Sequence, residues 1–302
     1  MKDLLLLWEW PWDAPFVQRV LCAASAAGVA ASAAGPEETL ACLERLSAGG
    51  PAPLVIIDRA SDVLPSAARL VADAKARGVL VVNDPDRAAA AVDKARMHLA
   101  LMSIGVEVPW TLLLPPDRVL TPQDEEALTS VGTPFVIKPA HGGGGDGVVL
   151  GASTLADIAR ARLACADDTV LVQEHIVPRD FGGRPAYFRV LYCLGDIHPC
   201  FWHPDTSEYA ALSEAERASD WARGLEAVAR AIAGVSLMSL FSTEVALSVD
   251  GRWVAVDYVN DMCDLRPASL CAGGVPDPVL DAIVRRLVAA AGAGSPGTPA
   301  EA

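Results

Sequence analysis

A glycine-rich stretch behind a single lysine has the clearest chemical character in this sequence. The run from Thr133 to Val149 reads TPFVIKPAHGGGGDGVV, where an apolar segment ends at Lys138 and five glycines follow within six positions. Such a turn can lay backbone N–H groups against phosphate oxygens, because no side chain intervenes, while the lysine supplies positive charge. The lysine precedes the glycines, so this is not a P-loop, and the glycines lie between two predicted strands instead of opening a helix, so it is not a dinucleotide loop. The stretch alone leaves two interpretations open: a phosphate-binding loop, or a flexible hairpin loop beside a surface lysine.

Two acidic residues on a predicted hairpin form the second chemical feature. The segment TEVALSVDGRWVAVDYVN turns at Asp250-Gly251, a dipeptide favoured at tight turns, and carries Glu244 on one arm and Asp257 on the other. Mg²⁺ prefers oxygen ligands and often sits on one or two carboxylates completed by phosphates. Asn260 would add an amide oxygen. The alternative is a pair of solvent-facing acids, although a carboxylate inside an apolar strand is costly unless it is paired or bound to metal.

The first third of the chain alternates strands with helices. The predicted strands are Leu4–Trp8, Leu54–Asp58 and Val79–Asn83, and the predicted helices are Pro15–Ala34 and Ser66–Arg77. This alternation predicts a parallel sheet covered by helices, in which ligands bind at the carboxyl ends of the strands. The segment WEWPWD follows the first strand, so a small molecule could bind there, although its tryptophans are more typical of packing than of a ligand cage.

The rest of the chain indicates antiparallel hairpins between helices. Helical patterns cover Asp86–Ile104 and Glu214–Ala233. Strands are predicted in PWTLLLPP, in FVIKP and GVVLG on either side of the glycines, and in VLVQEHI. The segment YFRVLYCLGDIHPCFWH predicts two strands around Gly195-Asp196. The C-terminal AGAGSPGTPAEA is predicted to be disordered.

Composition and charge limit the partners of this protein. The chain has 302 residues, 52% of them hydrophobic, which allows two or three compact units. Its formal net charge of −14 disfavours nucleic acid and anionic membranes as partners. Seven cysteines with no CxxC pair are typical of reduced thiols, and no membrane-spanning segment is predicted, so we expect a cytoplasmic protein.

Four motifs in sequence order carry a resemblance to a known superfamily. AVDKARMHLALMSIGVEVPW, the lysine and glycine stretch, VLVQEHIVPRDF and TEVALSVDGRWVAVDYVN succeed one another between about residues 91 and 270. This succession resembles the ATP-grasp superfamily, including D-alanine–D-alanine ligase, glutathione synthetase and ribosomal-protein S6 glutamate ligases. The resemblance implies an α/β (α+β) fold with an N-terminal Rossmann-like domain (1–88), a central subdomain (89–168) and a C-terminal subdomain (169–291), followed by a disordered tail (292–302).

The resemblance also implies roles for individual residues. Lys94 and Lys138 match the phosphate-contacting lysines, and Asp180 matches the acid that binds the ribose hydroxyls. The segment Gln173–Ile176 matches the adenine strand, where the backbone of Glu174 and Ile176 pairs with the adenine edge and the side chain of Gln173 or Glu174 accepts from its amino group. The residues expected to bind nucleotide are Lys94, Lys138, His141, Gly142, Gly143, Gly144, Gly145, Gly147, Gln173, Glu174, His175, Ile176 and Asp180.

The metal and catalytic positions follow the same resemblance, with one departure. Glu244, Asp257 and Asn260 match the Mg²⁺ ligands, but the superfamily spaces its last two ligands by two residues, whereas these stand three apart. That spacing demands a β-bulge, or it puts Asp261 or Asn260 in a different role. Arg189 matches an arginine aimed at the γ-phosphate or acyl phosphate. Arg266 would bind a substrate carboxylate, or form a salt bridge with a neighbouring aspartate.

The activity implied by the resemblance is that of an ADP-forming carboxylate–amine ligase, which uses ATP and Mg²⁺ to form an amide or peptide bond through an acyl phosphate. Its partners would be a small-molecule carboxylate and an amine, with a homodimer expected by analogy. Two alternatives remain: a kinase of the same fold that phosphorylates a hydroxyl, as inositol-phosphate kinases do, and a non-catalytic nucleotide-binding protein.

Overall fold

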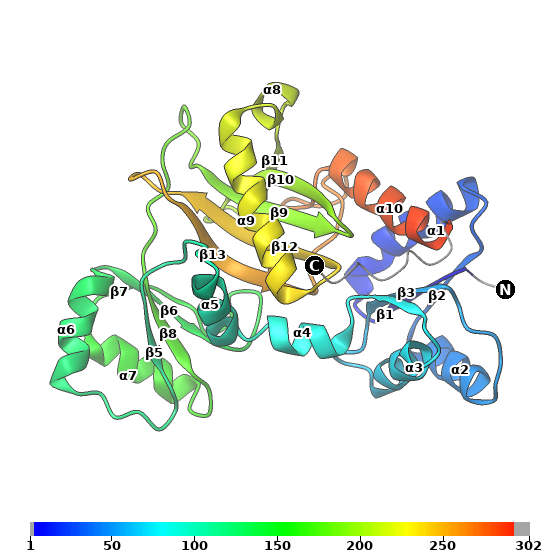
Figure 1. The fold of residues 1–302 in the computed structure, drawn as a ribbon, viewed down its shortest axis with the longest axis horizontal. Coiled ribbons are helices and arrows are strands. Elements are labelled where there is room, and N and C mark those ends of the chain that lie inside the picture. The colour runs from blue at the N-terminus through cyan, green and yellow to red at the C-terminus, as the bar shows by residue number, and fades with distance from the viewer. Residues whose placement is uncertain (1–2, 293–302) are drawn as a thin grey trace.

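The computed structural model describes residues 3–292, which form three sheets (Figure 1). The first sheet is parallel, with the strand order β2-β1-β3-β4, and lies at one end of the molecule. Its strands are β1 (Leu4–Trp8), β2 (Ala31–Ala34), β3 (Val55–Arg59) and β4 (Leu80–Val82). The parallel sheet predicted from the sequence is therefore confirmed.

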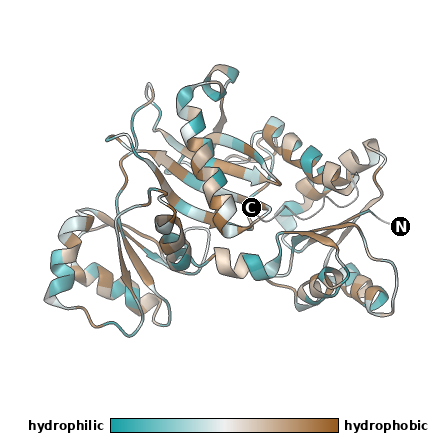
Figure 2. Cartoon of the chain, viewed as in Figure 1, coloured by the Kyte–Doolittle hydropathy of each residue, from teal (hydrophilic) through white to brown (hydrophobic). Residues whose placement is uncertain are grey.

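Helices cover both faces of this sheet, and they are η1 (Pro11–Asp13), α1 (Ala14–Ala26), α2 (Pro36–Ser47), α3 (Pro65–Lys75) and α10 (Asp277–Gly292). Leu4 and Leu6 of β1 pack with α1 and α10, whereas Leu5 and Leu7 pack with α2 and α3. Because side chains of a strand alternate between the two faces, a strand covered on both sides is apolar throughout. Figure 2 shows these strands as hydrophobic.

The structure corrects several predicted helix boundaries. The helix predicted for Pro15–Ala34 ends at Ala26, and its alanine-rich end forms β2 instead, because pairing with β1 outweighs the helix propensity of alanine. Helix α2 was not predicted, although Glu38 accepts a hydrogen bond from Gly35 N at 3.1 Å, a helix-start signal. The stretch Asp86–Ile104 is divided into α4 (Pro85–Ala91) and α5 (Lys94–Ser103), because Asp93 caps α5.

The second sheet is antiparallel, has the order β5-β8-β6-β7 and lies at the other end of the molecule (Figure 1). Its elements are β5 (Thr111–Leu114), α6 (Pro122–Val131), β6 (Phe135–Pro139), β7 (Val149–Ala152), α7 (Leu155–Ala164) and β8 (Val170–Glu174). Phe135, Ile137 and Val172 belong to the core shared with α6 and α7. Alternation therefore places Lys138 and Gln173 on the opposite face.

The third sheet is antiparallel, has the order β11-β10-β9-β12-β13 and lies between the other two (Figure 1). Its strands are β9 (Tyr187–Cys193), β10 (Asp196–His203), β11 (Glu208–Ala211), β12 (Leu240–Leu247) and β13 (Trp253–Asn260). The helix predicted for Glu214–Ala233 is divided into α8 (Glu214–Arg217) and α9 (Asp220–Ser236), and α9 packs against this sheet. The hairpin predicted at Asp250-Gly251 joins β12 and β13.

The chain returns to its first sheet at the end. Helix α10 shares a core with α1 and with Leu191, Cys193 and Cys200 of the third sheet. Strand β8 follows the predicted boundary at residue 168, yet it belongs to the same sheet as β5, β6 and β7. The domain boundaries at residues 88, 168 and 291 stay predictions. The predicted tail lies outside the described residues, apart from Gly292 at the end of α10.

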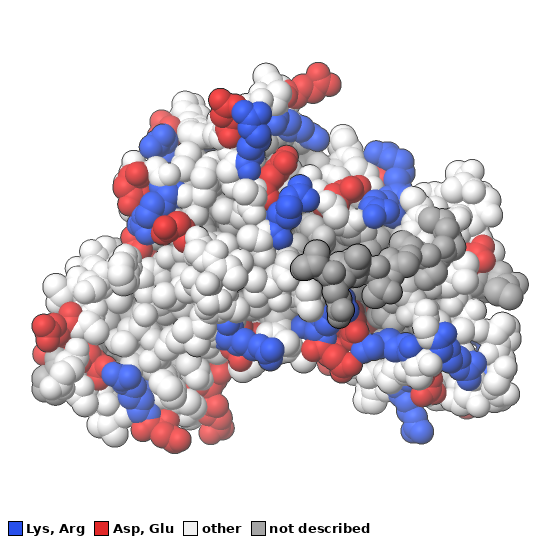
Figure 3. Space-filling model, viewed as in Figure 1, with Lys and Arg blue, Asp and Glu red and all other residues white. Residues whose placement is uncertain are grey.

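The surface mixes charges of both signs. On the face shown in Figure 3, Lys and Arg are scattered among Asp and Glu rather than gathered into one basic patch. No helix within residues 3–292 has the length and apolar character needed to cross a membrane.

Candidate nucleotide and metal site

Lys138 joins the second sheet to the third. It lies near the end of β6, on the face away from α6 and α7, and its Nζ donates to Val256 O of β13 at 3.0 Å. Val256 directly precedes Asp257. The lysine predicted to contact phosphate thus lies beside the strand predicted to hold the metal, although the two are 118 residues apart in sequence.

The predicted glycine loop follows β6. Gly142, Gly144, Gly145 and Gly147 have φ between 64° and 102°, a region that side chains disfavour. Nothing lies within 4 Å of a Cβ placed on any residue from Gly142 to Gly145, so backbone conformation rather than crowding requires glycine there. The role of the loop in binding phosphate stays a prediction.

Polar contacts tie the start of this loop to its neighbours. Lys94, the first residue of α5, donates from Nζ to Gly142 O at 2.5 Å and from its backbone N–H to Ala140 O at 2.9 Å. His141 donates from its backbone and from Nδ1 to the Asp168 carboxylate, at 2.8 and 2.9 Å. Lys94 therefore lies beside the start of the glycine loop, and a shared role of the two in binding phosphate stays a prediction.

The two predicted metal carboxylates are direct cross-strand neighbours. Glu244 of β12 pairs with Asp257 of β13, and Ser242 pairs with Asn260, with register shifts on both sides of the Glu244 pair. The bulge demanded by the three-residue spacing is therefore present. Since Ser242 and Glu244 are two apart on one strand, their partners Asn260 and Asp257 are brought to the same face of the sheet.

The Glu244 carboxylate also has two partners on β9. Tyr187 donates its hydroxyl to Glu244 at 2.7 Å, and Arg189 Nη2 forms an ion pair with it. The Arg189 guanidinium stacks on the Trp202 ring, 3.9 Å from its centroid. Burial lowers the pKa of Arg189, but the Glu244 carboxylate outweighs this and holds that pKa above its ordinary value, so the arginine stays charged.

This donor set fits a magnesium–nucleotide complex. Arg189 Nε is buried and has no hydrogen-bond partner among the described residues, so one donor of this guanidinium is unused there. Within residues 3–292, no three His, Cys, Asp or Glu side chains are grouped for metal binding. Two carboxylates and the Asn260 amide are nevertheless sufficient for Mg²⁺ when phosphates complete its shell.

In the predicted adenine strand, Glu174 and Gln173 differ in how many of their hydrogen-bonding atoms already have a partner. Glu174 is engaged on both oxygens, since Arg252 Nη2 donates to Oε1 at 2.8 Å and Trp110 N donates to Oε2 at 3.2 Å. Gln173 is 2% exposed, and its Nε2 donates to the Thr111 hydroxyl and to Tyr258. The other two members of the segment are His175, which is exposed, and Ile176, which is buried.

The predicted ribose contact is not brought into this network. Asp180 is exposed, and its carboxylate accepts from Gly183 N at 2.8 Å, as an aspartate does in a turn. Its role in ribose binding stays a prediction.

Arg266 forms a salt bridge, the alternative left open by the sequence. It donates to both oxygens of Asp264 and lies 5.7 Å from the Trp10 ring centroid and 6.0 Å from that of Trp12. Trp10 and Trp12 are 39% and 60% exposed, so the expectation that they are packing residues is wrong for these two. They follow β1, at the edge of the parallel sheet where the sequence indicated that a small molecule could bind.

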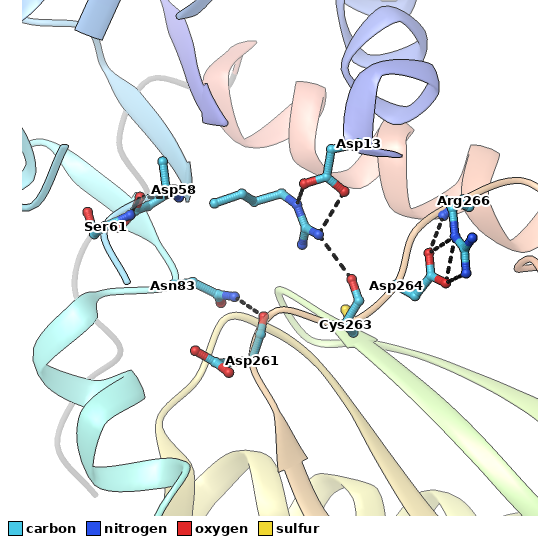
Figure 4. Close-up of polar contacts among 10 residues, drawn as sticks. Asp13, Asp58, Ser61, Asn83, Asp261, Cys263, Asp264 and Arg266 are labelled. Carbon is cyan, nitrogen blue, oxygen red and sulfur yellow. Dashed lines mark hydrogen bonds and ion pairs between the residues drawn. The ribbon is translucent and has the colours of Figure 1, made fainter. Parts of the chain in front are cut away.

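Contacts between the parallel sheet and the β12–β13 hairpin were missed by sequence reasoning (Figure 4). Asn83, just after β4, donates to Asp261 O at 2.9 Å and accepts from Leu240 N at 2.8 Å. It thereby holds the start of β12 and the end of β13 together. Its position at a strand end was the only signal, because both partners lie more than 150 residues away.

A buried ion pair strengthens the same junction. Arg59, at the end of β3, donates to both oxygens of Asp13 and to Cys263 O, just beyond β13. Nearby, burial raises the pKa of Asp58 and of Asp261 above their ordinary values. A charged residue ending an apolar strand was the available signal for Arg59.

Comparison with known proteins gives matches in structure alone. No protein-family model matches the sequence, and no curated protein matches it. The RimK domain protein ATP-grasp from Sphaerobacter thermophilus is 19% identical, with a TM-score of 0.60 over 94% of this chain and 99% of that one. The D-cycloserine synthetase DcsG is 18% identical, with a TM-score of 0.63 over 95% and 99%. The ATP-grasp ligase PsnB, complexed with the precursor peptide PsnA2 and AMPPNP, is 16% identical, with a TM-score of 0.63 over 95% and 97%. Together these likenesses show that the chain has the ATP-grasp fold.

Proposed function

We propose that this protein is an ATP-dependent carboxylate–amine ligase, which forms an amide or peptide bond through an acyl phosphate and releases ADP and phosphate. The contact between Lys138 Nζ and Val256 O carries the proposal. It brings the predicted phosphate-binding lysine of one sheet to the predicted metal carboxylates, Glu244 and Asp257, of another. A site that transfers a phosphoryl group needs cationic and metal-binding groups at one place.

The residues of this chain would act by position and charge. Lys138 and Arg189 would offset negative charge as it moves from the γ-phosphate to the bridging oxygen. Mg²⁺, held by Glu244, Asp257 and Asn260, would neutralise the phosphates. Closure of the glycine loop would keep water from the acyl phosphate.

The names of similar structures favour ligation over phosphorylation of an alcohol. PsnB is described as a ligase with a precursor peptide, DcsG as a synthetase and MdnB as a macrocyclase. We therefore include a peptide among the carboxylate or amine substrates. The homodimer, the cytoplasmic location and the lack of nucleic-acid or membrane partners stay predictions.

Trapping the intermediate tests the reaction class. Incubation with magnesium–ATP and a panel of carboxylic acids, without amine, should leave an acyl phosphate that hydroxylamine converts to a hydroxamate in proportion to the ADP released. A phosphate monoester does not react with hydroxylamine. A parallel incubation with alcohols that gives a stable phosphorylated alcohol, with no hydroxamate or amide in either incubation, would instead establish a kinase on the same fold.

A further inference from the structure

Glu244 has donors on one side and a second carboxylate on the other. Its strand β12 lies between β9 and β13 in the third sheet. On β9, Arg189 directly opposes Glu244, and Tyr187 stands two residues earlier, on the same face as Arg189. On β13, the cross-strand neighbour of Glu244 is Asp257. The donors therefore hold the carboxylate from the β9 side, away from the second acid.

Each oxygen of the Glu244 carboxylate has one donor. The Tyr187 hydroxyl donates to Oε2 at 2.7 Å, and Arg189 Nη2 donates to Oε1. No other described residue donates to this carboxylate. An ionised carboxylate offers about four acceptor positions, so about half of them remain for a cation.

The two donors differ in charge. The Arg189 guanidinium offsets the negative charge of the carboxylate, whereas the Tyr187 hydroxyl is neutral and can orient it without reducing the charge that a cation needs. Tyr187 is 8% exposed. Its ring belongs to a buried cluster with Ile176, Trp202, Ala246 and Val254. The hydroxyl is therefore held in place by the packing of its ring.

The other tyrosines of the third sheet do not share this contact. Tyr258 follows Asp257 on β13, but its hydroxyl lies 2.7 Å from His98 Nδ1 and 3.2 Å from Gln173 Nε2. Among the described residues, Tyr187 is the only tyrosine whose hydroxyl bonds to a predicted metal ligand. It is also absent from the positions that the superfamily resemblance implied.

We propose that Tyr187 is a positioning residue of the metal site, whose hydroxyl holds the Glu244 carboxylate in the orientation that binds Mg²⁺ together with Asp257. The inference rests on the proposed function. Groups that hydrogen-bond to a metal ligand fix its orientation, and removing one typically weakens metal binding by about 10- to 100-fold.

Calorimetry on the full chain with AMPPNP, an ATP analogue that is not hydrolysed, tests this role in Mg²⁺ and in EDTA. The ratio of the two dissociation constants is the magnesium gain. The wild type should show a large gain, because without a cation the phosphates meet the carboxylates of Glu244 and Asp257. Tyr187→Phe should reduce the gain about tenfold. Its affinity in EDTA should change by less than about twofold.

A second variant tests whether the hydroxyl acts through the carboxylate. Adding Tyr187→Phe to Glu244→Gln should change the magnesium gain of that variant by less than about twofold, because the ligand that the hydroxyl orients is already lost.

Tyr192→Phe is the matched control. Tyr192 lies on the opposite face of β9, where its ring centroid is 5.1 Å from that of Phe241, and its hydroxyl has no hydrogen bond to a described residue. This variant should keep the wild-type gain.

The outcomes separate the inference from the proposed function. An unchanged magnesium gain in Tyr187→Phe, or equal losses of affinity in Mg²⁺ and in EDTA, would overturn the inference, since a purely structural role weakens binding under both conditions. A full further loss in the double variant would also overturn it. Wild-type protein that binds AMPPNP under neither condition, or equally under both, would instead contradict the proposed magnesium–ATP site itself.

Discussion

Two arginine–carboxylate pairs of this protein differ in their surroundings. The side chains of Arg59 and Asp13 are 2% and 1% exposed, and three hydrogen bonds hold the guanidinium. Those of Arg189 and Glu244 are 18% and 17% exposed, and the carboxylate directly opposes Asp257 on the next strand. Each arginine has one buried nitrogen without a partner in the described chain, so this feature is common to both pairs. The pairs differ in the exposure of their side chains and in the residues that surround them. The enclosed pair joins sheets, whereas the accessible pair suits a binding site.

The largest expected effect is on stability at the enclosed pair. Arg59→Met should lower the free energy of unfolding by about 3–5 kcal/mol, because Asp13 is left as a buried charge without its partner. Urea denaturation monitored by circular dichroism measures this. The double variant Asp13→Leu, Arg59→Met should recover much of the loss. A single variant as stable as the wild type would show that the pair does not hold the sheets together.

The accessible pair should show the reverse behaviour. Glu244→Gln should lower ATP turnover at least about 100-fold, while the free energy of unfolding should fall by less than in Arg59→Met. The control is Glu216→Gln, since Glu216 pairs with Arg184, whose guanidinium stacks on Phe201 at 3.9 Å, matching the geometry of Arg189 on Trp202. Equal losses of turnover in the two variants would remove any special role for Glu244.

The features of this site that depend on neighbouring residues could be predicted from the sequence, whereas those that depend on long-range contacts could not. The spacing of Asp257 and Asn260 predicted either a bulge or a different role for Asp261 or Asn260, and the structure has the bulge. The dipeptide Asp250-Gly251 was enough to predict the hairpin. The roles of Asn83 and Tyr258 were not predictable, because their partners come from other sheets or helices, far away in sequence. Strand β2 was missed for a related reason, since only its pairing with β1 makes an alanine-rich segment extended.

A smaller effect concerns the pH dependence of stability through His98. This buried side chain is neutral at neutral pH, whereas the arginine of the accessible pair is charged. Its pKa is lowered from 6.5 to about 4 by burial, so the unfolded chain binds a proton there between these pH values while the folded chain does not. The wild type should therefore lose stability as pH falls from 6.5 to about 4, relative to His98→Gln, by up to about 3 kcal/mol. The variant keeps an acceptor for Tyr258 but cannot titrate. Parallel stability curves over this range would mean that His98 is protonated in the folded protein.

The central claim is that Lys138 and the β12–β13 hairpin form one ATP site, and the affinity of Lys138→Met for ATP tests it most directly. Calorimetry should show binding weakened by more than about 1.4 kcal/mol, or tenfold, because the phosphates lose their compensating charge. Lys75→Met, which removes a lysine paired with Asp84 and Asp86 beside the parallel sheet, should bind as the wild type does. Unchanged affinity in Lys138→Met, with the protein still folded, would contradict the account.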